Sequence, residues 1–202
     1  KPAGRYDIMA KPAGPACNLA CRYCFYREKA RLYGERSSFA MNPELLESFI
    51  RQYIEKQDAP GVHFSWQGGE PTLTGIDFFR RVVEYEQKFG RSGQYVSNGV
   101  QTNGTLIDED NIDTVVEVGY DYVGISIDGL RDTHDRFRRK TGAFDAALRG
   151  IRLCREAGIK VGLRFTLTQD NRQDLPGLLQ LMDDERIDKF YLSHLNYAGR
   201  GN

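Results

Sequence analysis

The chain has 202 residues, and its 28 Lys and Arg residues are balanced by 28 Asp and Glu residues, so its formal net charge is zero. This length is sufficient for one sizeable core, and the charge balance argues against nucleic acid or an anionic membrane as the main partner. No apolar stretch approaches the ~20 residues of a membrane-spanning helix, and no signal peptide is visible. The few cysteines are clustered rather than spread as a disulfide scaffold, so we expect a protein of the reducing cytoplasm.

Short apolar runs alternate with amphipathic stretches along the chain, as in a protein built from strand–helix units. The apolar runs predict strands at residues 6–11, 62–66, 95–101, 122–127, 159–167 and 190–195. The amphipathic stretches predict helices at residues 44–56, 76–89, 108–118, 144–157 and 175–182. Asn42 and Pro43 form a typical N-cap and first helical position for the first of these helices. Six alternations predict an α/β fold with a parallel sheet, although periodicity alone does not separate a barrel from a flat, doubly wound sheet.

The loop after the first predicted strand carries three thiols, Cys17, Cys21 and Cys24, at spacings of four and three. Thiolates are soft ligands that suit iron–sulfur clusters, zinc and copper(I). A 4Fe–4S cluster normally takes four cysteines, so three in one loop favour a cluster with one iron left open to a substrate or cofactor. A zinc site and thiol redox chemistry are the alternatives. The other cysteine, Cys154, falls far away in a predicted helix, where it fits a small core residue.

Other candidate residues follow predicted strands, which is where parallel sheets place their sites. They are Gln67, Gly68, Gly69, Glu70, Thr102, Asn103, Ser126, Asp128 and Arg138. Ser126 and Asp128 are two residues apart, so strand alternation predicts that they share a face. Simpler explanations exist, because residues 67–71 also fit a tight turn with a capping Glu, and the basic run 136–140 fits a solvated face. Arg164, a charge within an apolar strand, indicates either an inward-facing side chain or a structural ion pair.

The segment Cys17-Asn18-Leu19-Ala20-Cys21-Arg22-Tyr23-Cys24, with an aromatic residue before its last cysteine, resembles the signature of the radical S-adenosylmethionine (SAM) superfamily. The resemblance implies an α/β fold with a partial (β/α)6 barrel of parallel strands. It also implies a 4Fe–4S cluster whose open iron binds SAM, a reduced ferredoxin- or flavodoxin-type electron donor, and cleavage of SAM to a 5′-deoxyadenosyl radical. Such cofactors carry the radical chemistry, while the protein positions and shields it.

Two further motifs resemble those with which this superfamily binds SAM. Gly68-Gly69-Glu70-Pro71 resembles its GGEP motif, and the resemblance assigns this segment, with Gln67 before it, to the methionine amino group. Ser126 and Arg138 stand at a spacing that holds the SAM carboxylate in sulfatase-maturating relatives, and Asp128 lies between them. A guanidinium suits this role because its planar fork can bind a carboxylate through two hydrogen bonds.

The remaining SAM contacts are expected from single residues. Tyr23 is expected near the adenine, Leu195 to offer a backbone contact there, and Asn103 to contact the ribose or the substrate. The resemblance identifies no catalytic base within this chain, because the maturases take a carboxylate base from a region beyond the last predicted strand.

Two parts of the chain resemble different radical SAM families. Residues 6–108, with the motif Gln101-Thr102-Asn103-Gly104-Thr105-Leu106, resemble the anaerobic sulfatase-maturating enzymes, which oxidise a Cys or Ser of a sulfatase to formylglycine. Residues 110–202, with the motif Phe190-Tyr191-Leu192-Ser193-His194-Leu195, resemble the radical SAM protein of haem d1 biosynthesis, which modifies propionate side chains of a tetrapyrrole. The residues around the cysteine loop match the maturases, so a sulfatase peptide is the leading substrate expectation and a tetrapyrrole is the alternative.

Both families continue into a cysteine-rich domain with auxiliary clusters, whereas this chain has no cysteine after Cys154. We therefore expect residues 1–202 to be a radical SAM core domain from which that second domain is absent. SAM binding and cleavage are expected more firmly than complete turnover of a substrate. An inert metal-binding domain is the alternative from a different functional class, and it predicts a bound metal without SAM cleavage.

Overall fold

The computed structural model describes residues 6–33 and 39–195 of the chain. Within these residues, six strands form one parallel sheet in the sequential order β1-β2-β3-β4-β5-β6. The strands are β1 (Ile8–Ala10), β2 (Gly61–Trp66), β3 (Tyr95–Thr102), β4 (Tyr122–Ser126), β5 (Lys160–Leu167) and β6 (Lys189–His194). In this part of the chain β1 and β6 do not pair with each other, so the sheet is a half-barrel. The expected partial barrel of parallel strands is confirmed.

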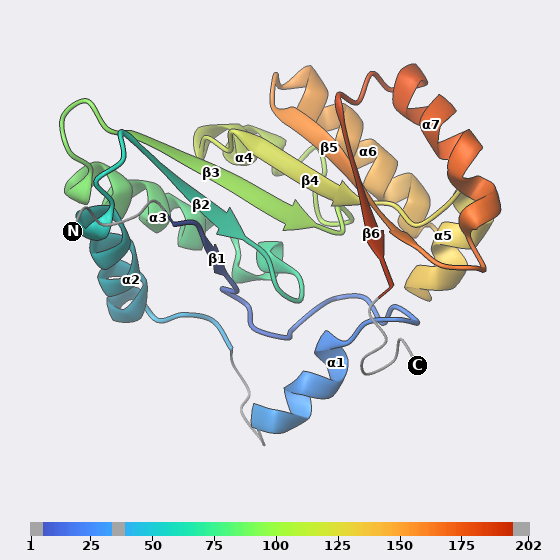
Figure 1. The fold of residues 1–202 in the computed structure, drawn as a ribbon, viewed down its shortest axis with the longest axis horizontal. Coiled ribbons are helices and arrows are strands. Elements are labelled where there is room, and N and C mark those ends of the chain that lie inside the picture. Colours follow the sequence, from blue (N-terminus) through green and yellow to red (C-terminus); the bar gives the residue numbers. More distant parts are fainter. Residues whose placement is uncertain (1–5, 34–38, 196–202) are drawn as a thin grey trace.

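Most helices pack on the outer face of this sheet (Figure 1). The α-helices are α1 (Tyr26–Lys29), α2 (Pro43–Lys56), α3 (Ile76–Phe89), α4 (Ile112–Glu117), α5 (Arg131–Arg138), α6 (Ala143–Glu156) and α7 (Leu175–Asp184). Short 3₁₀ helices occur at η1 (Ala30–Tyr33), η2 (Pro71–Thr74) and η3 (Arg172–Asp174). Figure 1 shows α1 apart from the other helices, near the carboxyl ends of the strands. No helix of the described segments is long and apolar enough to cross a lipid bilayer.

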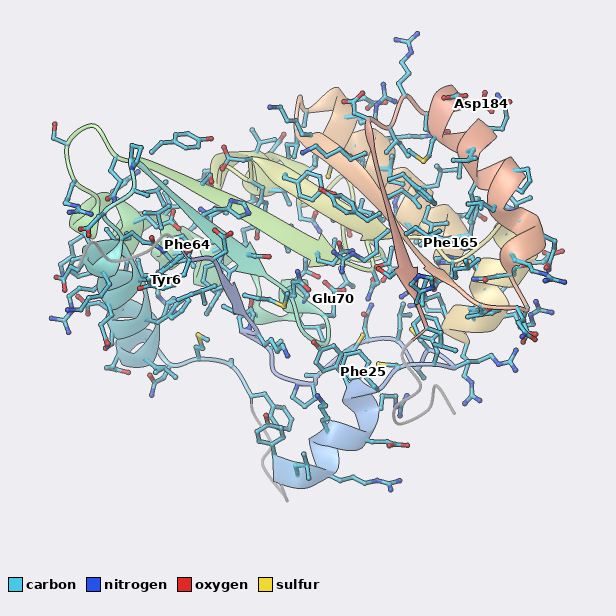
Figure 2. All side chains as sticks on the ribbon, in the orientation of Figure 1. Tyr6, Phe25, Phe64, Glu70, Phe165 and Asp184 are labelled. Carbon is cyan, nitrogen blue, oxygen red and sulfur yellow. The ribbon has the colours of Figure 1, made fainter. Side chains whose placement is uncertain are left out.

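The hydrophobic core lies between the outer face of the sheet and the helices. On β2, Val62, Phe64 and Trp66 are buried, whereas the residues between them point to the inside of the half-barrel and are half-buried. Phe165 of β5 is fully buried in the same core, and Figure 2 labels it and Phe64 in separate parts of the sheet. Because the core occupies the outer face, the inner face can carry polar side chains.

The first helix that the sequence predicts corresponds to α2, and it begins where expected. The Asn42 side chain accepts a hydrogen bond of 2.8 Å from the Leu45 amide, and Pro43 occupies the first helical position of α2. α3 spans the predicted residues 76–89. α4 is shorter than predicted, because the Asn111 side chain accepts from the Asp108 amide at 3.1 Å and holds the preceding residues in a turn.

α5 overlaps the basic run 136–140, for which the sequence favoured a solvated face of a helix or loop. That interpretation is wrong for Phe137 and Arg138, which are buried. The carboxyl end of α5 packs against the cysteine loop, where the Arg22 amide donates to the Phe137 carbonyl at 2.8 Å. The helix therefore helps to position the loop that carries the three thiols.

Candidate functional site

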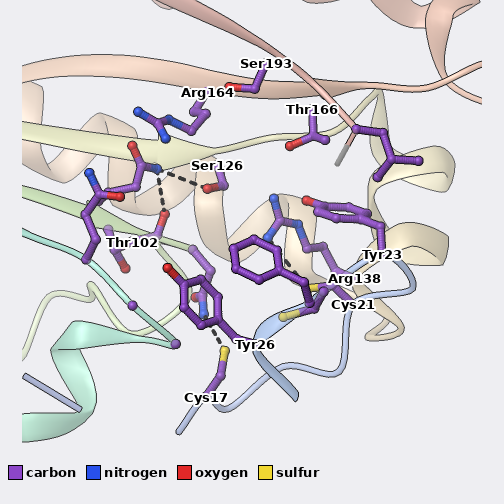
Figure 3. Close-up of a pocket in the computed structure, with 18 of the residues that line it drawn as sticks. Cys17, Cys21, Tyr23, Tyr26, Thr102, Ser126, Arg138, Arg164, Thr166 and Ser193 are labelled. Carbon is purple, nitrogen blue, oxygen red and sulfur yellow. Dashed lines mark hydrogen bonds between the residues drawn. The ribbon is translucent and has the colours of Figure 1, made fainter. Parts of the chain in front are cut away.

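The carboxyl ends of the strands border a cavity of about 270 Å³ (Figure 3). The cysteine loop, the segments after β2 and β3, α5 and the inner faces of β4 to β6 all contribute to its wall. The candidate residues that line it are Cys17, Cys21, Tyr23, Cys24, Gln67, Gly68, Gly69, Thr102, Asn103, Ser126, Arg138 and Leu195. Two other candidates, Glu70 and Asp128, are fully buried behind this wall.

The three thiols of the cysteine loop share this cavity. Cys21 is buried, and Cys17 and Cys24 are half-buried. Burial raises the pKa of the Cys17 thiol to about 11 and also raises the pKa of Cys21, so both thiols hold their protons until a metal displaces them. Cys154 of α6 lies in the hydrophobic core, as the sequence indicated. Within the described residues, no three His, Cys, Asp or Glu side chains converge on a single metal ion.

Two glycines allow the cysteine loop to lie directly against the segment after β2. The Gly69 amide donates to the Gly14 carbonyl at 2.8 Å, and the Glu70 amide donates to the Ala16 carbonyl at 2.7 Å. A side chain at position 69 would collide with the Ala16 carbonyl, so only glycine fits there. Gly68 has a φ of 121°, a conformation that also favours glycine. The glycine pair is therefore required for the backbone contact that holds the loop.

Glu70 joins the carboxyl ends of β2 and β3. Its carboxylate accepts hydrogen bonds from the Thr72 amide at 3.1 Å, the Thr72 hydroxyl at 2.7 Å, the Thr102 hydroxyl at 2.7 Å and the Asn103 amide at 2.8 Å. Burial raises the pKa of Glu70, while these donors lower it. The expected contact between this carboxylate and a ligand amino group is not supported, because the side chain has no surface toward the cavity.

Asp128 holds a buried network rather than facing the cavity. Its Oδ2 lies 2.7 Å from Arg138 Nη2 and accepts from the Tyr23 hydroxyl at 2.6 Å. Its amide donates to His134 Nδ1 at 3.1 Å. Ile127, between Ser126 and Asp128, lies in the hydrophobic core, and its amide donates to the Arg164 carbonyl at 3.0 Å. Strand alternation therefore extends to Asp128, whose partners Tyr23 and Arg138 line the cavity with Ser126.

Arg138 carries the positive charge closest to the thiols. Its Nη1 lies 3.6 Å from Cys21 Sγ. Burial disfavours the charged form, but the Asp128 carboxylate, Tyr23 and Cys21 together outweigh this effect and raise the pKa of Arg138, so the side chain stays cationic. Its Nε has no hydrogen-bond partner among the described residues. A buried cation in a cavity wall with an unused N–H is suited to bind an anionic group.

Asn103 presents its amide NH₂ to the cysteine loop. Its Nδ2 donates to Asn18 Oδ1 at 2.8 Å and lies 3.9 Å from Cys17 Sγ. Its Oδ1 accepts from the Thr105 amide at 2.9 Å and from the Thr105 hydroxyl at 2.6 Å. These bonds fix the orientation of the amide, with its donors toward Cys17.

The cavity wall also contains residues that were not among the sequence candidates. They are Phe25, Tyr26, Gln101, Thr166, Ser193 and His194. Gln101 donates to Ser126 Oγ at 3.1 Å. Arg164 points into the half-barrel, and no carboxylate of the described residues lies within ion-pair distance of it. The strand register pairs Ser126 with Arg164 and Thr166 with Ser193. Knowledge of this register would have identified Thr166 and Ser193 as residues of the wall.

Comparison with known families gives a consistent result. A family model described as the Radical SAM superfamily matches residues 12–182. The chain is 45% identical over 186 residues to the Pre-heme d1 synthase of Dinoroseobacter shibae, which is 92% of this chain and 43% of that protein. It is 41% identical over 156 residues to a serine-type anaerobic sulfatase-maturating enzyme of Bacteroides thetaiotaomicron, covering 76% of this chain and 37% of that one. The chain thus spans less than half the length of these curated relatives.

Solved structures show the same fold. A structure described as native anSMEcpe with bound AdoMet is 27% identical and has a TM-score of 0.81. The match covers 93% of this chain and 51% of that chain. Another, described as native anSMEcpe with bound AdoMet and Cp18Cys peptide, is 28% identical with a TM-score of 0.79, over 94% of this chain and 50% of that chain. The half-barrel is therefore common to this chain and these structures.

Proposed function

The chain belongs to the radical SAM superfamily of enzymes, and we propose that it holds a 4Fe–4S cluster through Cys17, Cys21 and Cys24 and cleaves SAM beside that cluster. The observation that carries the proposal is that these three thiols line one cavity together with the buried cation Arg138. Thiolates suit iron–sulfur clusters, and three protein ligands leave one iron open to a further ligand.

The residues present fit such a cluster. The three thiols come from one loop and line the same cavity, so a single group bound there can reach all three. Cys154 is fully buried in the core, so it does not compete as a fourth ligand. Cys17, Cys21 and Cys24 would hold a cluster that would supply the one electron needed to cleave SAM to methionine and a 5′-deoxyadenosyl radical, which would take hydrogen from the substrate. The protein must release the thiol protons to bind it, so loading should improve as the pH rises.

We assign the two charged groups of SAM to different sides of the cavity. The carboxylate is assigned to Arg138, supported by its unpaired Nε, and to Ser126 on β4. The amino group is assigned to Gln67 and to the backbone at Gly68 and Gly69, which line the cavity in place of the buried carboxylate that follows them. In this assignment the Arg138 cation faces the SAM carboxylate, and the uncharged acceptors of Gln67 and the glycine backbone face the SAM amino group.

The remaining parts of SAM are assigned to the other candidates in the wall. Tyr23 and Leu195 take the adenine, and Asn103 takes the ribose, because all three line the same cavity. Glu70 and Asp128 are positioning residues that act through the loops and side chains they hold. The tyrosine hydroxyl is already bonded to the Asp128 carboxylate, so its ring is the part left for stacking.

A sulfatase peptide is the leading substrate, with a Cys or Ser oxidised to formylglycine. Maturases are among the relatives of this chain, and a similar solved structure carries a bound peptide. A tetrapyrrole is the second candidate, because Pre-heme d1 synthase is similar over nearly the whole chain. We further propose one radical SAM core domain, in a cytoplasmic protein that receives its electron from a reduced ferredoxin- or flavodoxin-type donor. The single sheet and single core of the described residues support one domain.

Production of 5′-deoxyadenosine tests the central proposal. The protein is reconstituted with iron and sulfide without oxygen, reduced with dithionite, given SAM and assayed by liquid chromatography and mass spectrometry. Cys21→Ala should abolish the product, whereas Cys154→Ala removes a buried thiol from the core and should retain it. A fully loaded cluster that yields no 5′-deoxyadenosine, or metal analysis that finds zinc, would reject the assignment.

The substrate is tested in the same assay with each candidate in turn. A peptide carrying Cys-x-Pro-x-Arg or Ser-x-Pro-x-Arg should gain a formylglycine aldehyde if this chain carries maturase chemistry. A sirohaem-derived precursor should change mass at its side chains if the substrate is a tetrapyrrole. Product from one and not the other decides between them.

A further inference from the structure

A second cavity of about 270 Å³ adjoins the first inside the half-barrel. The two cavities share Gln67, Gln101 and Arg164 in their walls. The second also contains Lys189 at the start of β6, and no Asp or Glu of the described residues lines it. Its other wall residues are His63, Ser65, Gly99, Val100, Tyr122 and Tyr191. The interior behind the SAM cavity is therefore positively charged.

Arg164 is the central charge of this second cavity. Its Nε is buried without a hydrogen-bond partner in the part of the chain that the structure describes. Its guanidinium lies 5.8 Å from the centre of the Tyr191 ring, which does not neutralise a charge. Figure 3 shows Arg164 across the cavity from Cys17 and Cys21. Because this half-buried cation lines the cavity and has no carboxylate of the described residues within ion-pair distance, the arrangement points to an anionic ligand.

The positions of the cations along the strands separate this cavity from the residues assigned to the SAM carboxylate. Arg164 precedes Thr166 by two residues on β5, so it lies about 6–7 Å further from the carboxyl edge of the sheet. Lys189 pairs with Gly162, which is further inside again. Arg138, by contrast, lies beside Cys21. The two cations of the second cavity therefore lead away from the thiols.

Glycines on neighbouring strands make room for two side chains of this cavity wall, Gln101 and Tyr122. Gly124 and Gly162 are paired in the register of β4 and β5. A side chain at Gly162 would collide with the Tyr122 hydroxyl, and one at Gly124 would collide with the Gln101 side chain. The Tyr122 ring can therefore lie against the sheet. This ring lies 6.3 Å from the Tyr191 ring, so the two rings form one aromatic side of the cavity.

We propose that the second cavity is a substrate subsite that binds a carboxylate through Arg164. Lys189 adds a second positive charge, and the rings of Tyr122 and Tyr191, 6.3 Å apart, contact the apolar skeleton that bears the carboxylate. This inference rests on the proposed function, because the substrate must reach from this subsite into the cavity where SAM is cleaved. The substrate class is accordingly a carboxylic acid with an apolar or aromatic body.

A matched pair of small molecules tests this subsite without turnover. The probes are 3-phenylpropionate and 3-phenylpropionamide, which share a shape and differ in charge. Their dissociation constants are measured by ligand-observed NMR with the reconstituted, unreduced protein. The acid should bind about tenfold more tightly than the amide, since a charge-assisted bond contributes about that factor. Arg164→Gln should remove this preference, whereas Arg51→Gln, an exposed arginine on α2, should leave it unchanged.

Three results would contradict the subsite itself, and a fourth would contradict only the function on which it rests. Equal binding of acid and amide to the unaltered protein excludes carboxylate recognition here. If Arg164→Gln weakens SAM in equilibrium dialysis and leaves the acid unaffected, Arg164 belongs to the SAM site. If that variant does not fold by circular dichroism, Lys189→Gln replaces it, with an expected loss of about threefold, and an unchanged acid preference is then the contrary result. Probe binding without 5′-deoxyadenosine formation would refute the proposed function alone.

Discussion

The guanidinium of Arg138 lies 2.7 Å from the carboxylate of Asp128, with the two side chains 8% and 0% exposed. The Tyr23 hydroxyl bonds to the same carboxylate oxygen at 2.6 Å. α5, the cysteine loop and the segment after β4 therefore meet at one buried oxygen. Because Arg138 Nη1 is also 3.6 Å from Cys21 Sγ, this pair fixes a positive charge beside one of the thiols.

Asp128→Asn should lower the free energy of unfolding by about 3 kcal/mol, because it keeps the shape and leaves a buried cation without its counter-charge. Urea unfolding followed by circular dichroism measures this change. Glu47→Gln is the control, since it removes an exposed pair with Lys88 and should cost at most about 0.5 kcal/mol. Equal losses in the two variants would contradict the importance of the buried pair.

Gly69→Ala should prevent the cysteine loop from packing, because the added methyl group would occupy the position of the Ala16 carbonyl. We expect the purified, reconstituted variant to hold much less iron and sulfide per chain than the unaltered protein. Gly61→Ala at the start of β2 is the matched control, since the nearest atom to its added methyl group would be the Tyr95 carbonyl oxygen at 3.9 Å. Full cluster loading in Gly69→Ala would show that the contact is dispensable.

Glu70→Gln should destabilise the protein by about 2 kcal/mol, because an amide NH₂ would face hydrogen-bond donors in a fully buried position. Thr102→Val, which removes one of those donors, should cost about 1 kcal/mol. Thermal and urea unfolding of both variants measure the two effects. Glu84→Gln on the exposed face of α3 is the control and should change little. A stable Glu70→Gln protein that has lost only SAM affinity would instead indicate direct contact with SAM.

Local spacing was enough to find the parts of the site that one segment encodes. Cys17, Cys21 and Cys24 lie in one loop, and Asn42 caps the helix that begins next to it in sequence. The glycine pair was also found, although its role in admitting the Ala16 carbonyl depends on a loop about fifty residues earlier. The cysteines and the helix cap are recognisable from sequence because the residues that act together lie within a few positions of one another.

The residues that sequence reasoning placed less well depend on partners from other strands. Glu70 is a good candidate for an amino group until Thr102 and Asn103 of the next unit occupy its oxygens. Whether Arg164 faces the cavity or forms an ion pair depends on the register of β5 and on which carboxylates lie nearby. Both are tertiary facts, and periodicity does not contain them.

A buried carboxyl group away from the site predicts a pH-dependent stability. Glu86 of α3 accepts from Asn98 Nδ2 at 2.8 Å through Oε2, while its Oε1 has no partner among the described residues. Burial raises the pKa of Glu86 from its ordinary value of 4.5 to about 7, against the lowering effect of Asn98. Between these two pH values the folded state keeps a proton that the unfolded state has released. The stabilisation is thus complete below pH 4.5 and is lost as the pH rises through about 7.

Glu86→Gln should remove this dependence because the amide does not titrate. The free energy of unfolding of the unaltered protein, minus that of the variant, should fall by at most about 3 kcal/mol between pH 4.5 and 7.5. His134 acts in the opposite direction, since burial lowers its pKa to about 3, but it is common to both proteins and cancels in the difference. Urea titrations at half-unit pH intervals measure the curve. A difference that stays flat would mean that the Glu86 carboxyl is solvated in the folded protein.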